Sequence, residues 1–161
     1  QWWAIDPDGR MYLYREMYMT RRTVRVHARQ IHEHTDRKVE ATVADHDAED
    51  RATLEENDIY TDLADKRVMP GIQKVQERLK VQGDGKPRLF IMRDAVVESD
   101  WRLGDEKRPT STLEEFPAYV WNDKVTKDEP AKLDDHGMDA MRYAVMYLDG
   151  LWSGPAVMEL W

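Results

Sequence analysis

The spacing of apolar and polar residues predicts alternating strands and helices. Two apolar stretches, Trp2–Ile5 and Met11–Met19, flank the turn sequence Asp6-Pro7-Asp8-Gly9, which predicts a β-hairpin. After the hairpin, helical spacing and short β-branched runs alternate along the chain. The predicted helices are residues 21–34, 47–56, 70–81, 111–116 and 134–148, and the predicted strands are residues 39–44, 58–64 and 88–92.

Polar residues at the ends of these segments refine the prediction. Thr20 and Asp47 are the expected N-caps of two helices, and Ser111 with Glu114 has the spacing of a capping box. Residues 93–132 otherwise have few apolar positions and are expected to be mostly loop. Residues 83–86 (GDGK) lack the spacing of a phosphate-binding loop and are expected to form a turn. A hairpin followed by strand–helix alternation predicts an α/β fold with a mixed sheet and helices on both faces.

The composition limits the class of protein. The 161 residues suit a single domain with its own core, here taken as 1–161, and 41% hydrophobic residues are too many for a disordered chain. The absence of cysteine excludes a disulfide scaffold, an iron–sulfur protein and a thiolate zinc site. No apolar run approaches the ~18–20 residues of a membrane helix, so no membrane partner is expected. The net charge of −8 argues against sequence-independent DNA wrapping, but bound metal ions still allow a nucleic-acid enzyme.

Aspartates stand at two places where chemistry is expected. Asp45 follows the predicted strand 39–44, and ligands of α/β sheets bind beyond the carboxyl ends of strands. Asp135 and Asp139 are four residues apart on one face of the last predicted helix, where they repel unless a cation lies between them. Hard divalent cations such as Mg²⁺ prefer carboxylate oxygens. Helix capping also explains Asp134 and Asp135, and a turn also explains Asp45, so spacing alone leaves both interpretations open.

Five stretches of the chain carry a family resemblance. The last is Asp134–Ala144 (DDHGMDAMRYA), and the others, in order, are Ala4–Glu16, Val43–Glu56, Ala64–Leu79 and Thr112–Trp121. Together they span nearly the whole chain, which resembles the nuclease domain of the terminase large subunit of tailed bacteriophages. The resemblance implies an RNase H-like fold and a metal-binding hydrolase, an endonuclease that cuts concatemeric viral double-stranded DNA during packaging.

The family also implies where the catalytic acids lie. Its three acidic positions are on the first strand, at the end of a later strand and on the last helix. By motif, the second falls on Asp45 and the third on Asp135, with Asp139 as a neighbouring candidate and Asp134 as a further option. These residues are expected to bind two Mg²⁺ or Mn²⁺ ions. The first strand, and the packaging ATPase domain before it, are expected to precede Gln1.

The resemblance further implies partners and a location. The expected partners are double-stranded DNA, the packaging ATPase domain, the terminase small subunit and the portal, in the cytoplasm of the host cell. Two other functions stay open. The first is an inactive DNA-holding or docking module of the packaging motor, and the second is another RNase H-like nuclease, such as a resolvase or transposase core. Arg142-Tyr143-Ala144 in the closing stretch favours the terminase over a resolvase or transposase.

Overall fold

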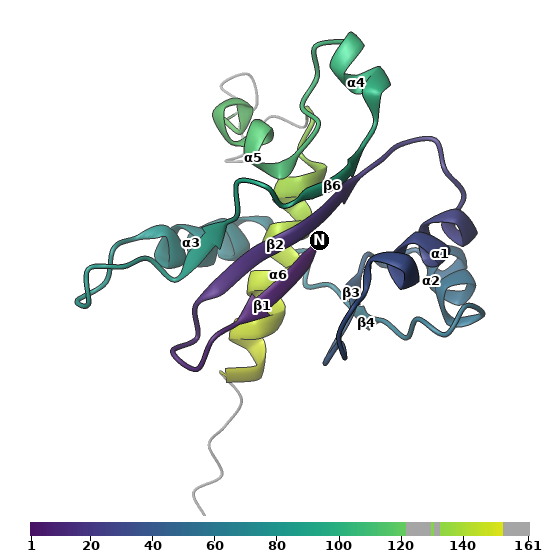
Figure 1. Ribbon diagram of the computed structural model, residues 1–161. Helices are drawn as coiled ribbons and strands as arrows, with labels where there is room; N and C mark the ends of the chain where they lie inside the picture. Colours follow the sequence, from purple (N-terminus) through teal and green to yellow (C-terminus); the bar gives the residue numbers. More distant parts are fainter. Residues whose placement is uncertain (122–129, 131–132, 153–161) are drawn as a thin grey trace, which may run out of the picture.

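The computed structural model describes residues 1–121, 130 and 133–152, with Trp152 described by its backbone only. Within these residues the chain forms a four-stranded mixed sheet, a separate pair of short strands, and helices that pack against them (Figure 1). The predicted mixed α/β class is confirmed. No helix of the described part of the chain is long and apolar enough to cross a bilayer.

Strand β2 (Met11–Tyr18) is the centre of the four-stranded sheet. It runs antiparallel to β1 (Trp2–Ile5), as the hairpin prediction requires. On its other side it pairs in parallel with β5 (Leu89–Ile91) along its first half and with β6 (Val96–Ser99) along its second half. Met11 and Leu13 are buried in its first half and Glu16 and Tyr18 in its second, so the alternation shifts by one residue between the two halves.

The two short strands form a second, parallel sheet. They are β3 (Val43–Ala44) and β4 (Asp62–Leu63), and α2 (Ala48–Glu55) connects them. Asp47 is the N-cap of α2, as predicted, and its carboxylate accepts hydrogen bonds from the N–H groups of Glu49 and Asp50 at 3.0 and 2.9 Å. Both strands are shorter than the predicted ranges 39–44 and 58–64. Each pairs with only one neighbour among the described residues, which limits its length.

Helices α1 (Val24–His34) and α3 (Val68–Leu79) begin at residues other than those predicted. Arg21 has a φ of 55°, in the left-handed region, so a helix cannot start there and the predicted Thr20 cap is wrong. The hydroxyl of Thr20 instead donates to Oδ2 of Asp100 at 2.6 Å. Helix α3 begins before Pro70, which lies in its first turn, where its missing N–H costs no hydrogen bond.

The region predicted as loop contains two elements that the sequence did not indicate. Strand β6 exists because it pairs with β2, and α4 (Trp101–Asp105) follows it with Asp100 as its cap. The short helix α5 (Thr112–Glu115), followed by the 3₁₀ turn η1 (Phe116–Ala118), agrees with the prediction for 111–116. Ser111 accepts from the N–H of Glu114, but the Glu114 carboxylate binds Thr110, so the capping box is only half formed. Residues 122–129 and 131–132 of the predicted loop lie outside the described residues.

Helix α6 (His136–Trp152) crosses behind the four-stranded sheet (Figure 1). Its residues Met141 and Val145 are fully buried and pack with Met11 and Leu89 of the sheet. The same helix also contacts α3, α5 and β3. Helix α6 therefore lies against both sheets and sets their relative position.

A buried carboxylate fixes the start of α6. Glu115 is fully buried, and its carboxylate accepts hydrogen bonds from the N–H groups of Gly137 at 2.9 Å and Met138 at 2.7 Å, and from the Tyr18 hydroxyl. Burial raises the pKa of Glu115, and these hydrogen bonds oppose that shift. A carboxylate at this place also meets the positive end of the helix dipole. Glu115 thus ties α5 and β2 to the first turn of α6.

Two glycines allow α6 to lie close to its neighbours. A Cβ atom on Gly137 would stand 2.3 Å from Oγ1 and 2.9 Å from Cα of Thr112 on α5. A Cβ atom on Gly71 of α3 would stand 2.4 Å from Cγ of Arg142 on α6. Contacts this short do not occur for real side chains, so the packing of α6 depends on the absence of a side chain at both positions.

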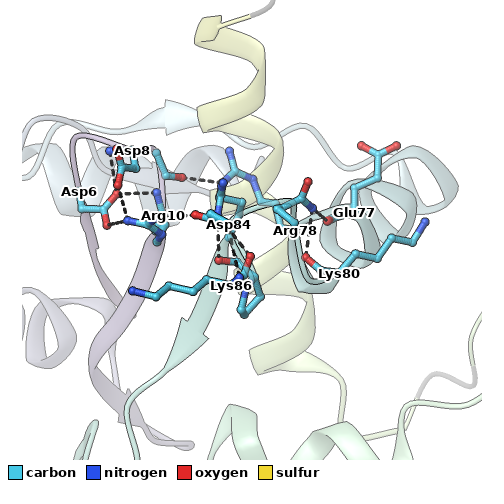
Figure 2. A network of polar contacts seen from close by, with 12 residues as sticks. Asp6, Asp8, Arg10, Glu77, Arg78, Lys80, Asp84 and Lys86 are labelled. Atoms are coloured by element: carbon cyan, nitrogen blue, oxygen red, sulfur yellow. Dashed lines mark hydrogen bonds and ion pairs between the residues drawn. The ribbon is translucent and has the colours of Figure 1, made fainter.

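A charged network joins the β1–β2 turn to the loop after α3 (Figure 2). The Arg10 guanidinium lies between the carboxylates of Asp6, Asp8 and Asp84, at 3.1, 2.5 and 2.8 Å. The guanidinium groups of Arg88 and Arg10 hold the pKa of Asp84 well below its usual value. The predicted turn at 83–86 is confirmed, with the N–H of residue 85 bonded to the carbonyl of residue 82. The aspartates of the hairpin turn are structural.

Gly137→Ala is expected to destabilise the fold by roughly 1–3 kcal/mol, because the added methyl group meets the backbone of Thr112. Gly150→Ala, in the same helix, is the matched control, since nothing lies within 4 Å of its Cβ position. Urea denaturation measures both free energies of unfolding. Equal stability of the two variants would contradict the close approach of α5 and α6.

Candidate metal-binding site

Asp45 stands directly after β3, at the carboxyl end of that strand, as predicted. Its side chain is 54% exposed, and the Lys66 ammonium Nζ lies 2.5 Å from Oδ1. The Lys66 ammonium holds the pKa of Asp45 below its usual value. Lys66 itself comes from the segment between β4 and α3. Because β3 and β4 are parallel, the residues that follow them meet at one edge of the short sheet.

Asp139 lies in the first turn of α6 and is held by a buried arginine. Nη2 of Arg142 donates to Oδ1 of Asp139 at 2.7 Å, while Nη1 donates to the carbonyl oxygen of Arg67 at 3.3 Å. The Arg142 side chain is only 4% exposed and lies over the ring of Tyr143, 4.8 Å from its centroid. Arg142 therefore joins Asp139 to the segment that also carries Lys66.

Lys66 and Tyr143 connect the two aspartates. Burial raises the pKa of the Tyr143 phenol, and the charges of Asp139 and Asp45 raise it further. The pKa of Lys66 is raised mainly by its hydrogen bond to Asp45, and Tyr143 and Asp139 add to that shift. Lys66, which pairs with Asp45, is followed directly by Arg67, whose carbonyl accepts from the arginine that holds Asp139. The contact of α6 with β3 links the two parts of the chain.

The two other predicted aspartates occupy different environments. The carbonyl oxygen of Asp135 accepts the N–H of Asp139 at 2.8 Å, so Asp135 precedes the first turn of α6. Burial raises the pKa of Tyr119, and the charges of Asp139 and Asp135 add to that shift. Asp134 has a φ of 50° and forms a separate ion pair with Arg108, 2.5 Å away.

Histidines beside these acids have structural or exposed positions. Nε2 of His46 lies 2.8 Å from the carbonyl oxygen of Ala64, which links the ends of β3 and β4. His136 is exposed at the start of α6. Among the residues that the structure describes, no three acidic or histidine side chains form a metal-binding cluster on their own. Asp45 and Asp139 are therefore two candidate oxygen ligands, each paired with a basic side chain.

The strand edges nearest this region are unpaired within the described residues. The carbonyl groups of Thr42 and Ala44 accept hydrogen bonds from β4, which turns the peptide groups of Val43 to the opposite edge of β3. In β1, the pairing with β2 likewise turns the peptide groups of Trp3 and Ile5 away from β2. No described strand pairs with either edge.

A pocket of about 260 Å³ opens beside Asp45, between α1, α2, β2 and β3. Apolar residues supply much of its lining, and they are Met17, Val24, Ile31, Ala44 and Leu54. A second pocket, of about 150 Å³, lies between α3, η1 and α6. No carboxylate lines this second pocket, and Arg142 separates it from Asp139. Of the two, only the pocket beside Asp45 adjoins the candidate ligands.

No protein-family model matches the sequence, and no curated protein or solved structure matches it either.

Sequence reasoning missed Lys66, Arg142 and Tyr143 as members of the site. Asp45 directly follows the end of β3 at Ala44. Lys66 lies shortly after the end of β4 at Leu63. The rule that pointed to Asp45, that residues beyond parallel strands meet at one edge, also applies to Lys66. Arg142 and Tyr143 lie one turn after Asp139 on α6, and the helical period places them on its side of the helix.

Lys66→Met is expected to raise the pKa of Asp45, because the variant removes the ammonium group that stabilises the carboxylate. Carboxyl ¹³C chemical shifts of Asp45, followed from neutral to acidic pH, measure this change. Lys74→Met is the matched control, since Lys74 has a similar exposed fraction, 45% against 44%, and pairs with Glu77 and Asp149 instead. An Asp45 titration that is the same in all three proteins would contradict the ion pair.

Proposed function

We propose that this chain is an RNase H-like nuclease domain that binds Mg²⁺ or Mn²⁺ through Asp45 and Asp139 and cleaves double-stranded DNA. One observation carries the proposal. Asp45 pairs with Lys66, and the carbonyl of the next residue, Arg67, accepts from Arg142, which holds Asp139 on the helix that contacts β3. Both aspartates come from the motifs that resemble those of terminase nucleases. Asp135, which precedes Asp139 by one helical turn, is a further ligand from the same side.

The chemistry of the donors fits a hard divalent cation. Carboxylate oxygens are the ligands that Mg²⁺ and Mn²⁺ prefer, and the exposed position of Asp45 leaves room for water and a phosphate. Two ions held there would supply the chemistry of phosphodiester hydrolysis, in which metal lowers the pKa of an attacking water and stabilises the leaving 3′ oxygen. Asp45 and Asp139 would hold the ions, while Arg142 orients Asp139 through its hydrogen bond.

A third carboxylate is proposed to come from a strand between β1 and β3. The unpaired peptide groups of Trp3, Ile5 and Val43 offer hydrogen bonds to such a strand, and the apolar pocket beside Asp45 offers room for its side chains. The terminase resemblance supports this arrangement, since the family's first acid lies on a strand before the hairpin. The new strand would join the two sheets and carry its acid toward Asp45.

The resemblance also supports a biological role. The domain is proposed to cut concatemeric viral DNA during genome packaging, joined to the packaging ATPase and acting with the small subunit and the portal. One observation favours a DNA-holding or docking module instead. Asp45 and Asp139 are each already neutralised by a basic side chain, Lys66 and Arg142.

Asp45→Asn and Asp139→Asn are expected to lower Mn²⁺-dependent cleavage of plasmid DNA by more than about 100-fold, since direct ligands matter more than their outer partners. The assay uses the full natural protein. Asp94→Asn, an exposed aspartate between β5 and β6, is the control and is expected to cleave normally.

The result decides between the two functions. Cleavage that is unchanged in the Asp45→Asn variant would contradict the assigned site. Tight DNA binding by the unsubstituted protein, with no cleavage in either metal, would favour the docking module.

A further inference from the structure

Lys66 pairs with one of the proposed ligands, and the residue after it, Arg67, is bonded to the arginine that holds the other. The Nζ atom of Lys66 lies 2.5 Å from Asp45, and Asp139 and Tyr143 both act on its charge. A positive group placed near two carboxylates reduces their repulsion. Among the basic side chains around this site, Lys66 is the one that contacts Asp45.

The two basic residues of the site differ in how easily they move. Arg142 is 4% exposed, donates to both Asp139 and the Arg67 carbonyl, and stacks on Tyr143. Lys66 is 44% exposed, and Asp45 is its only ion-pair partner within the described residues. A lysine on a flexible stem in a half-exposed ion pair is held weakly and can leave at little cost. Arg142 is therefore fixed, whereas Lys66 is free to turn toward solvent.

We infer that the Lys66 ammonium group takes the place of a metal cation beside Asp45, and that a divalent ion binds by displacing this group from Asp45. This inference rests on the proposed function. In the metal-free protein the ammonium group balances Asp45 and Asp139. When an ion binds, Lys66 turns outward and stays near the site as a positive charge. Lys66 therefore sets the concentration of metal at which the site fills.

The inference predicts an increase in metal affinity when the lysine is removed. Lys66→Met removes both the competing ion pair and the repulsion between the ammonium group and the ion. The dissociation constant for Mn²⁺ is expected to fall on the order of tenfold. Lys66→Arg keeps the charge and is expected to bind Mn²⁺ no more tightly than the unsubstituted protein.

Mn²⁺ titration of the chain, followed by electron paramagnetic resonance at fixed pH and ionic strength, measures these affinities without any cleavage assay. Lys74→Met removes one positive charge of similar exposure from α3 and is expected to leave the affinity unchanged. Asp45→Asn shows whether the titrated ion is the one at this site. Thermal unfolding of each variant confirms that the fold is retained.

The outcomes separate this inference from the proposed function. If Mn²⁺ does not bind, or binds equally well to the Asp45→Asn variant, the metal site itself is wrong and both proposals fail. If Mn²⁺ binds at Asp45 but Lys66→Met leaves its affinity unchanged, Lys66 is only a surface ion pair. If Lys66→Met weakens binding, Lys66 orients Asp45 instead of competing for it. The last two results overturn the inference and leave the site in place.

Discussion

The hydrogen bonds from the first turn of α6 to the buried Glu115 carboxylate determine where that helix lies, and the rest of the structure depends on its position. Gly137 allows α6 to meet α5 without a clash, and Gly71 makes room for the Arg142 stem. From this start the helix covers the four-stranded sheet and reaches β3. Since β3 belongs to a separate pair of strands, α6 is the element that brings Asp139 to Asp45.

Charge balance within the site follows from the same packing. The chain has a net charge of −8, yet each candidate ligand lies next to a cation. Arg142 is buried along α3 and α6, so its pairing with Asp139 is a consequence of how those helices pack. Lys66 reaches Asp45 because β3 and β4 are parallel and end at one edge. An acidic domain can thus hold several carboxylates close together before any metal ion binds.

The sequence predicted features that depend on local order and missed features that depend on distant pairing. The hairpin, the Asp47 cap and the amphipathic last helix were predictable because each is encoded within a few neighbouring residues. Strand β6 could not be predicted, since Val96–Ser99 is a strand only through its pairing with β2. Thr20 failed as a cap because Arg21 takes a left-handed conformation that no composition rule indicates.

The candidate site shows the same division. Asp45 and the acids of α6 were named from strand ends and helical spacing, but nothing local shows that Lys66 pairs with Asp45 and Arg142 with Asp139. Asp134 lies in a different environment from Asp135 and Asp139, because its carboxylate forms an ion pair with Arg108 from the distant α4–α5 connection. Partners supplied by long-range packing, such as Lys66 and Arg142, become visible only in the folded chain.

The central claim is that Asp45 and Asp139 belong to one binding site for divalent cations. Anomalous scattering from crystals soaked in Mn²⁺ tests it most directly. The account predicts an anomalous peak within coordination distance of carboxylate oxygens from both residues. Peaks only at other places, with Lys66 still bound to Asp45, would contradict it.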